Sequence, residues 1–150
     1  ADNICRTCST FTANNGKCIG ITVFPNASID NYGSVKGEQN MKVEILNRGP
    51  IACGINAMPI LNYKGGIFSD TNFSKEIDHI ISVIGWGHDD KTDTQYWIVR
   101  NSWGEYWGEL GYIRVQTGNL LGLENDCAWA TPKSWTEINK PCFEDGSNCS

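Results

Sequence analysis

The sequence lacks any long apolar run and any stretch rich in lysine and arginine. Its longest apolar stretch, residues 80–86, is far below the ~20 residues that a membrane-spanning helix needs. The 12 lysine and arginine residues are outnumbered by 17 aspartate and glutamate residues, which gives a formal charge of −5. These absences exclude a membrane-spanning helix and make nucleic acid an unexpected partner.

The chain also lacks an initiator methionine, and its first residues form neither the basic segment nor the apolar core of a signal peptide. We therefore expect a processed chain or a fragment of a longer protein. Internal repeats are absent as well. The 150 residues, 40% of them hydrophobic, are enough for one domain with its own core.

Cysteine, in contrast, is plentiful. Seven cysteines in 150 residues indicate an oxidising compartment, so we expect a lysosomal or secreted protein. Three N-glycosylation sequons agree with this, at Asn26, Asn72 and Asn148. Because the number of cysteines is odd, one thiol must be free or must pair outside this chain.

The hydrophobic pattern predicts one clear helix. Residues 38–48 place Met41, Ile45 and Leu46 on one face, and Gly49-Pro50 is a typical helix end. We expect this face to pack against the core.

The pattern from Pro50 onward is typical of strands. Residues 77–86 are apolar at nearly every position, so we expect a strand that is buried on both faces, and residues 87–94 form a polar hairpin loop. Short spacing between strands indicates an antiparallel sheet or barrel. The other predicted strands are residues 19–24, 51–57, 67–68, 95–101 and 111–117.

His79 lies inside the apolar run and has two interpretations. An isolated histidine in such a run is most often a core residue with a satisfied hydrogen bond. The functional alternative is a general base, whose imidazole must be held beside a nucleophile.

Asn101 ends the next predicted strand, and Trp97, Trp103 and Trp107 surround it in the sequence. Core packing alone would explain the tryptophans but not the polar residue between them. An asparagine carbonyl can accept the imidazole N–H and fix the tautomer and orientation of the ring. A neighbouring indole would shield that bond from water.

Three segments carry long motifs around these residues. Residues 78–87 contain Asp-His-Ile-Ile-Ser-Val-Ile-Gly-Trp-Gly, residues 96–104 contain Tyr-Trp-Ile-Val-Arg-Asn-Ser-Trp-Gly, and residues 107–112 contain Trp-Gly-Glu-x-Gly-Tyr. Together they resemble the histidine and asparagine motifs of the papain family of cysteine proteases. Segments 49–51 and 63–68 also match, and the resemblance covers about residues 30 to 130.

Within that family the chain is most similar to the cathepsin X (cathepsin Z) subfamily. The similarity includes Cys5-Arg6-Thr7-Cys8, Tyr32-Gly33-Ser34-Val35 and the segment 49–55. Members of this subfamily act mainly as lysosomal carboxypeptidases. The resemblance therefore implies removal of C-terminal residues from peptide or protein substrates, with protein inhibitors as further partners.

The resemblance also implies a role for individual residues. His79 is the catalytic histidine, Asn101 orients it, and Trp103 covers their hydrogen bond. No cofactor and no metal are implied. Other positions match residues that contact substrate: Trp107 on the primed side, Gly54, Ile77 and Ile80 in the non-primed pockets, and the backbone of Asp78.

The nucleophilic cysteine of the family is not recognisable in this sequence. It lies ~130–150 residues before the histidine, in a C-G-[SA]-C-[WY] setting, and none of the four cysteines before His79 has that setting. Cys127 follows His79 at the spacing of caspases but lacks their motif. We therefore expect the nucleophile on a missing N-terminal part, without which this chain is inactive.

The resemblance implies pairings for the cysteines. It pairs Cys53 with Cys127 and Cys8 with Cys18, and it leaves Cys5 to pair with a cysteine of the missing part. We expect Cys142 and Cys149 to pair locally. A zinc site on Cys5-x-x-Cys8 is the competing interpretation, but no second pair stands at ligand spacing.

The expected fold class is α+β. The resemblance implies the β-barrel domain of the papain fold, an antiparallel barrel with one or more flanking helices, without the helical domain that bears the nucleophile. We expect a cysteine-rich crossing segment at residues 1–20, the barrel domain at 21–131 and an irregular extension at 132–150.

Two functions remain open on the sequence. The first is the histidine- and asparagine-bearing half of a cysteine carboxypeptidase. The second is a non-catalytic homologue that binds peptides or proteins, and intact His79, Asn101 and Trp103 argue against it because binding alone does not need all three.

Overall fold

The computed structural model describes residues 7–9, 19–21 and 27–135. The chain divides into two units, Ala1–Asp30 with Pro132–Ser150, and Asn31–Thr131. In the first unit β1 (Thr7–Ser9) pairs antiparallel with β2 (Ile19–Ile21). The predictions for Cys5, Cys18, Cys142, Cys149, Asn26 and Asn148 lie outside the described residues.

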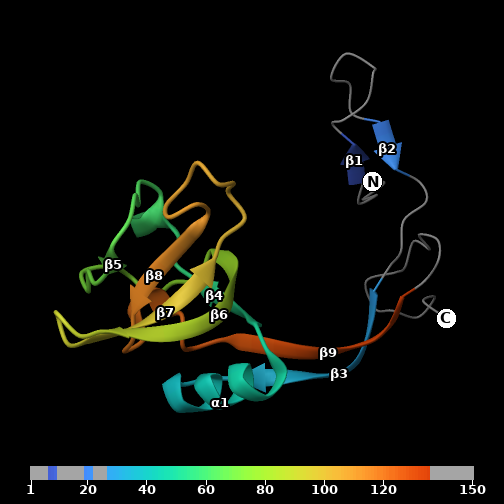
Figure 1. The fold of residues 1–150 in the computed structure, drawn as a ribbon, viewed down its shortest axis with the longest axis horizontal. Coiled ribbons are helices and arrows are strands. Elements are labelled where there is room, and N and C mark those ends of the chain that lie inside the picture. The colour runs from blue at the N-terminus through green and yellow to red at the C-terminus, as the bar shows by residue number, and fades with distance from the viewer. Residues whose placement is uncertain (1–6, 10–18, 22–26, 136–150) are drawn as a thin grey trace. The chain divides into compact units, whose positions relative to one another are not determined.

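A seven-stranded sheet forms most of the described structure (Figure 1). All of its described pairings are antiparallel except that between β5 and β8. The strands, in the order in which they lie side by side, are β3 (Ala27–Val35), β9 (Cys127–Trp135), β4 (Ile51–Ile55), β6 (His79–Asp89), β7 (Thr94–Arg100), β8 (Tyr112–Gln116) and β5 (Ile67–Phe68).

The expected barrel domain is an open sheet in the described residues rather than a closed barrel. β3 and β5 are the two edges of the sheet and do not pair with each other. β5 has only two residues, so it offers too few backbone groups to close a ladder, and it runs parallel to β8. The predicted class of sheet plus helix is confirmed, with α1 (Glu38–Arg48) as the α-helix among the described residues.

The bounds predicted for α1 are confirmed, because the local sequence favours both ends. Glu38 in the first turn and Arg48 in the last turn complement the helix dipole. Gly49, with φ 95°, ends the helix and donates its N–H to the Ile45 carbonyl at 2.9 Å. Lys42 binds Gln95 at 2.9 Å and so links α1 to β7.

One part of the predicted helix face is wrong. Met41 and Ile45 are buried, whereas Leu46 is 77% exposed. One residue corresponds to about 100° of rotation on a helix, so Leu46 turns away from the sheet that Ile45 contacts. The third buried position is Glu44.

The core lies where β4, β6, β7 and β8 face α1 and the loops. Trp97 is its largest fully buried side chain, and its indole N–H binds Glu124 Oε1 at 3.0 Å. This bond joins β7 to the segment before β9, beside the short 3-10 helix η2 (Leu120–Gly122). The other members with less than 2% exposure include Met41, Ile55, Ile60, Val83, Val99, Ile113, Val115 and Leu123.

The expectation that residues 77–86 are buried on both faces is wrong. Ile81 and Val83 are buried, while Ile80 is 62% exposed and Trp86 is 37% exposed. β6 therefore has one core face and one open face, which is ordinary for a strand of an antiparallel sheet.

Three of the described strands, β1, β3 and β9, were not predicted. β3 and β9 are polar at many positions, so they lack the apolar alternation of the other strands. β9 continues to Trp135, four residues past the boundary expected at residue 131. The division into three segments otherwise stays a prediction.

The Cys53–Cys127 disulfide is confirmed. It joins residues directly opposite each other on β4 and β9, and both cysteines are buried. It closes a loop of 74 residues, so it connects two strands that are distant in sequence.

Replacing both cysteines with alanine, in C53A/C127A, should lower the free energy of unfolding by about 4 kcal/mol, because the unfolded chain regains the entropy of the 74-residue loop. Urea denaturation followed by circular dichroism measures this change. A change below about 1 kcal/mol would show that the disulfide does not constrain the unfolded state as the loop-entropy relation requires.

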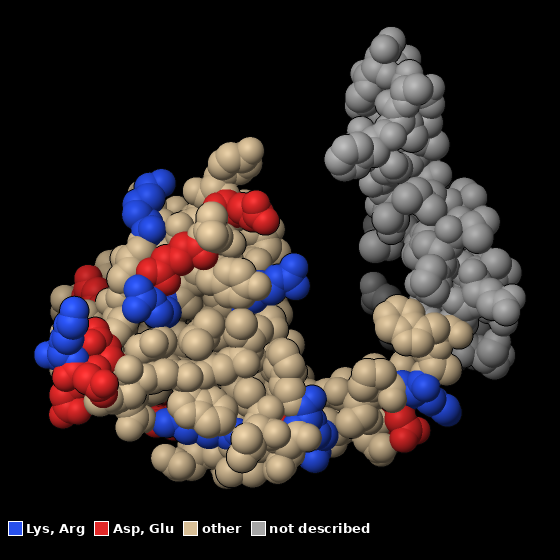
Figure 2. Space-filling view, viewed as in Figure 1, with Lys and Arg blue, Asp and Glu red and all other residues tan. Residues whose placement is uncertain are grey.

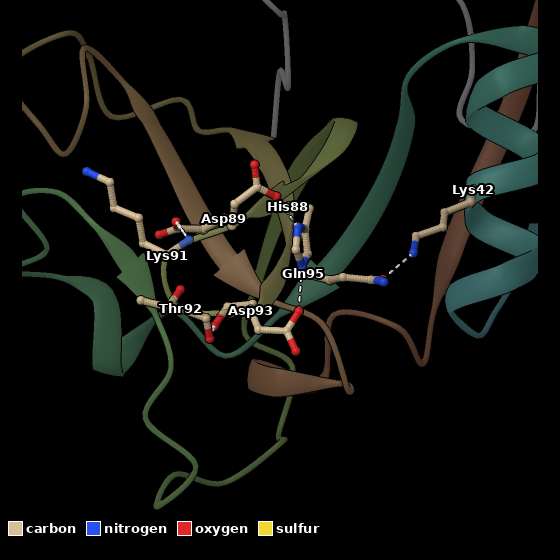
Figure 3. A network of polar contacts seen from close by, with 9 residues as sticks. Lys42, His88, Asp89, Lys91, Thr92, Asp93 and Gln95 are labelled. Carbon is tan, nitrogen blue, oxygen red and sulfur yellow. Dashed lines mark hydrogen bonds and ion pairs between the residues drawn. The ribbon is translucent and has the colours of Figure 1, made fainter.

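The hairpin of β6 and β7 carries a histidine between two carboxylates (Figure 3). His88 Nδ1 lies 2.9 Å from Asp90 Oδ1, and Nε2 lies 3.0 Å from Asp93 Oδ1. Ionised carboxylates only accept hydrogen bonds, so both contacts are hydrogen bonds only when His88 is the doubly protonated imidazolium. The hydrogen bonds to Asp90 and then Asp93 raise the pKa of His88 above its usual value.

Since the pKa of His88 is higher in the folded hairpin, its contribution to stability is complete below the unfolded pKa and is lost as pH rises through the folded value. Asp90→Asn and Asp93→Asn should each lower the His88 pKa in an NMR titration. Asp126→Asn, which removes an exposed carboxylate elsewhere, is the matched control. Equal shifts in all three variants would contradict the local origin of the effect.

Candidate active site

His79 and Asn101 lie at the same end of two neighbouring strands. His79 is the first residue of β6, and Asn101 directly follows the last residue of β7. The register pairs Ser82 with Arg100, so the two side chains meet across the strand ends. His79 Nε2 lies 2.9 Å from Asn101 Oδ1. The structure thus brings together the two residues that the sequence singled out.

The surroundings of Asn101 determine which tautomer of His79 is favoured. Asn101 is buried, its backbone N–H donates to the Gly111 carbonyl at 3.0 Å, and its Oδ1 accepts the Ser102 N–H at 2.8 Å. The amide oxygen is thereby held as an acceptor, so His79 Nε2 must donate. In the neutral ring Nδ1 then carries the lone pair, and it makes no hydrogen bond within the described part of the chain.

Trp103 covers the imidazole. Its ring centroid lies 5.0 Å from that of His79 with an interplanar angle of 28°, which is a stacked arrangement. Trp107 meets Trp103 edge-on at 5.1 Å. An apolar cover lowers the local dielectric, which strengthens the His79–Asn101 hydrogen bond and excludes competing water.

A hydrogen bond to the backbone and an aromatic contact hold the Trp107 side chain in place. It is 8% exposed, and its indole N–H binds the Ile60 carbonyl at 3.0 Å beside the short 3-10 helix η1 (Met58–Ile60). Its ring contacts Tyr63 at 5.6 Å. The predicted substrate contact of Trp107 stays a prediction, since the indole is mostly buried in the described residues.

The predicted pocket residues lie beside His79. Gly54 on β4 pairs with Ile80 on β6, and a Cβ at Gly54 would lie 2.6 Å from Ile77 Cγ2. Only glycine fits under Ile77 without displacing it. Asp78 is held by its backbone bond to Ile55 and by its carboxylate, which accepts the Ala57 N–H at 2.7 Å.

The chemistry available at this site is proton transfer. The two cysteine side chains that the structure describes, Cys53 and Cys127, form a disulfide, so neither has a free thiol that could act as a nucleophile. Among the described residues no group of three histidine, cysteine, aspartate or glutamate side chains could hold a metal ion. No helix in that part of the chain has the length and apolar character to cross a membrane.

A charged network beside the site was not predicted. Glu109 binds Arg114 through two hydrogen bonds of 2.9 and 2.6 Å and accepts the Gly66 N–H at 3.0 Å. The Arg114 guanidinium holds the pKa of the Glu109 carboxyl below its usual value, and burial raises the pKa of the neighbouring Tyr63 hydroxyl. Glu109 stands inside the predicted motif 107–112, but nothing in the sequence shows that Gly66 lies near it.

The charges elsewhere on the surface are mixed. On the face shown in Figure 2, basic side chains lie among acidic ones, and acidic side chains gather at the left edge over the tip of the β6–β7 hairpin. In the sequence the tip of this hairpin carries Asp89, Asp90 and Asp93 together with Lys91.

Comparison with known proteins gives consistent results. Residues 3–134 match the family described as "Papain family cysteine protease". Cathepsin Z from Onchocerca volvulus is 44% identical over 126 residues, which cover 78% of this chain and 41% of that protein. Cathepsin S from Bos taurus is 37% identical over 59% of this chain and 27% of that protein.

Solved structures show the same fold. Bromelain from Ananas comosus, in complex with the E64 inhibitor, superposes with a TM-score of 0.64 at 31% identity and covers 70% of this chain and 51% of that chain. Digestive procathepsin L 3 from Tenebrio molitor also gives 0.64, at 30% identity, with 69% and 36% covered. The chain thus spans about half the length of these relatives or less, and the predicted papain-like fold is confirmed.

Asn101→Ala should remove the acceptor that favours the Nε2–H tautomer of His79. We expect a mixture of tautomers in long-range proton–nitrogen NMR spectra and faster exchange of the Nε2 proton with water. Ser102→Ala, which keeps the backbone N–H, is the control. His88, the only other histidine, is an internal reference. An unchanged His79 spectrum would contradict the orienting bond.

Proposed function

Because the chain belongs to the papain family of cysteine proteases, we propose that it supplies the imidazole and amide of a cysteine peptidase active site. The observation that carries this proposal is the 2.9 Å contact of His79 Nε2 with Asn101 beneath the stacked Trp103 ring. This contact leaves Nδ1 as the nitrogen that can face a thiol.

The thiol would come from a segment outside these 150 residues. No cysteine before His79 has the family's nucleophile setting, and the two described cysteine side chains form a disulfide. The chain covers 41% of the Cathepsin Z relative, which leaves room for that segment. We place a disulfide to it at Cys5, because the cathepsin X resemblance pairs this position with a cysteine further upstream.

The reaction then uses His79 twice. Nδ1 takes the proton of the cysteine thiol and gives a thiolate–imidazolium pair. The thiolate attacks the peptide carbonyl, and the imidazolium protonates the leaving amine as the acyl-enzyme forms. Water, deprotonated by His79, hydrolyses the thioester and regenerates the thiol. Asn101 keeps the ring in the same orientation through both proton transfers.

The substrate side of the proposal concerns the exposed face beside His79. Ile77 and Ile80 are 38% and 62% exposed, so apolar surface is available next to the imidazole. We assign Ile77, Ile80 and Gly54 to non-primed pockets, the backbone of Asp78 to substrate contact and Trp107 to the primed side. The identity of 44% with Cathepsin Z favours carboxypeptidase activity and a lysosomal or secreted location.

The test uses the protein isolated together with any disulfide-linked companion. Intact mass before and after reduction shows whether a second chain is attached, and a thiol-directed active-site probe identifies the chain that carries the nucleophile. Activity is measured on peptides with a free C-terminus and on matched peptides with an amidated C-terminus. We expect cleavage of the first set and little cleavage of the second.

His79→Ala should lower kcat/KM by at least about 100-fold, since a positioned general base contributes roughly 10²- to 10⁴-fold. Asn101→Ala should cause a smaller loss, because the base remains but is poorly oriented. His88→Ala, which removes the other histidine, should leave activity unchanged. Peptide binding without thiol-dependent cleavage would instead support the non-catalytic homologue.

A further inference from the structure

We propose that Glu109 is a positioning residue for His79. Its carboxylate holds the segment of residues 102–111 in the shape that keeps Trp103 stacked on the imidazole. This inference rests on the proposed function, since it gives the stack a purpose, but the contacts that carry it are independent of any activity.

The carboxylate of Glu109 joins three parts of the chain. Arg114 on β8 donates to both carboxylate oxygens, at 2.9 and 2.6 Å, in a bidentate arrangement. The backbone N–H of Gly66, just before β5, donates to Oε1 at 3.0 Å. Glu109 also pairs through its backbone with Tyr112, at 2.9 and 3.1 Å. The carboxylate thus accepts three hydrogen bonds from two separate elements.

Tyr63 binds the same glycine from its other side. Its hydroxyl donates to the Gly66 carbonyl, and its ring contacts Trp107 at a centroid distance of 5.6 Å. Glu109 and Tyr63 therefore both bind Gly66, while Trp107 lies two residues from Glu109. The Gly111 N–H closes the turn by donating to the Trp107 carbonyl at 2.8 Å.

The backbone of the turn that contains Glu109 has little room to change its conformation. Gly108 has φ 59°, and a Cβ there would lie 2.5 Å from the Tyr112 carbonyl oxygen. The backbone around Glu109 is therefore close-packed against the start of β8. A displacement of the backbone at Glu109 would therefore move Trp107 or break the turn.

From Trp107 the contact continues to the imidazole. Trp107 meets Trp103 at 5.1 Å, and Trp103 stacks on His79 at 5.0 Å. A second path uses the backbone, because the Gly111 carbonyl accepts the Asn101 N–H at 3.0 Å. Both partners of the His79 imidazole, its cover and its acceptor, are thus attached to the turn that Glu109 holds.

The exposure of the ion pair favours positioning over stability. The Glu109 and Arg114 side chains are 31% and 36% exposed, and ion pairs near water add little to the free energy of folding. A bidentate pair, however, fixes direction as well as distance. Loss of Glu109 should therefore change the geometry of the site more than the stability of the fold.

The test compares Glu109→Ala and Glu109→Gln with Glu105→Gln in this chain. Glu105 lies in the same turn, is exposed, and makes no hydrogen bond or ion pair among the described residues. Proton NMR of the two histidines reports the site directly. Stacking on Trp103 shields the His79 ring protons, which gives them an upfield shift, whereas His88 lies on the hairpin and has its own partners.

We expect E109A to remove most of the upfield shift of the His79 ring protons and to speed exchange of the Nε2 proton. E109Q should have a smaller effect, because glutamine keeps an acceptor for Gly66 but loses the charge facing Arg114. E105Q should change neither histidine, and His88 should stay constant throughout. In the complete enzyme E109A and E109Q should lower kcat more than they raise KM, and E105Q should change neither constant.

A lower denaturation midpoint in E109A with unchanged His79 resonances would overturn the proposal, because the ion pair would then be structural only. Equal effects of E105Q and E109Q would also overturn it. If E109A does not fold, E109Q and Arg114→Lys decide the question. Failure of the proposed function, meaning no thiol-dependent cleavage, would leave these NMR results unaffected, so the two outcomes are distinguishable.

Discussion

The pairing of β6 with β7 is the constraint on which the site depends. Its register shifts by one residue between Val83 and Gly85, so β6 carries an extra residue there. A shift of one residue exchanges the two faces of a strand. Because of the bulge, the two ends of β6 pair with β7 in different registers. In the register at the His79 end, the side chain of His79 meets that of Asn101. Neither residue could be moved along its strand without losing the contact.

Local and motif-based features were predictable from the sequence, and non-local ones were not. The bounds of α1 follow from Glu38 and Gly49, whose effects act within one turn. The His79–Asn101 pair and the Cys53–Cys127 disulfide followed from family motifs. Barrel closure and the open face of β6 at Ile80 depend on what lies across the sheet, which apolar periodicity cannot show.

The Glu109 network illustrates the same limit in the site itself. Glu109 and Arg114 are five residues apart, so their pairing could have been guessed from the turn between them. Gly66 is 43 residues away, and its N–H carries no chemical mark in the sequence. The functional reason for Glu109 becomes visible only when the contacts of Trp107 and Trp103 are followed to His79.

Stability and positioning are carried by different residues in this chain. Trp97, Met41 and the Cys53–Cys127 disulfide are buried, so they hold the sheet and helix together through apolar contact and a covalent link. The groups that orient His79 are polar or partly exposed, and their contacts fix direction. A protein that transfers a proton at one nitrogen needs this second kind of contact, because an error of orientation costs rate even when the fold is intact.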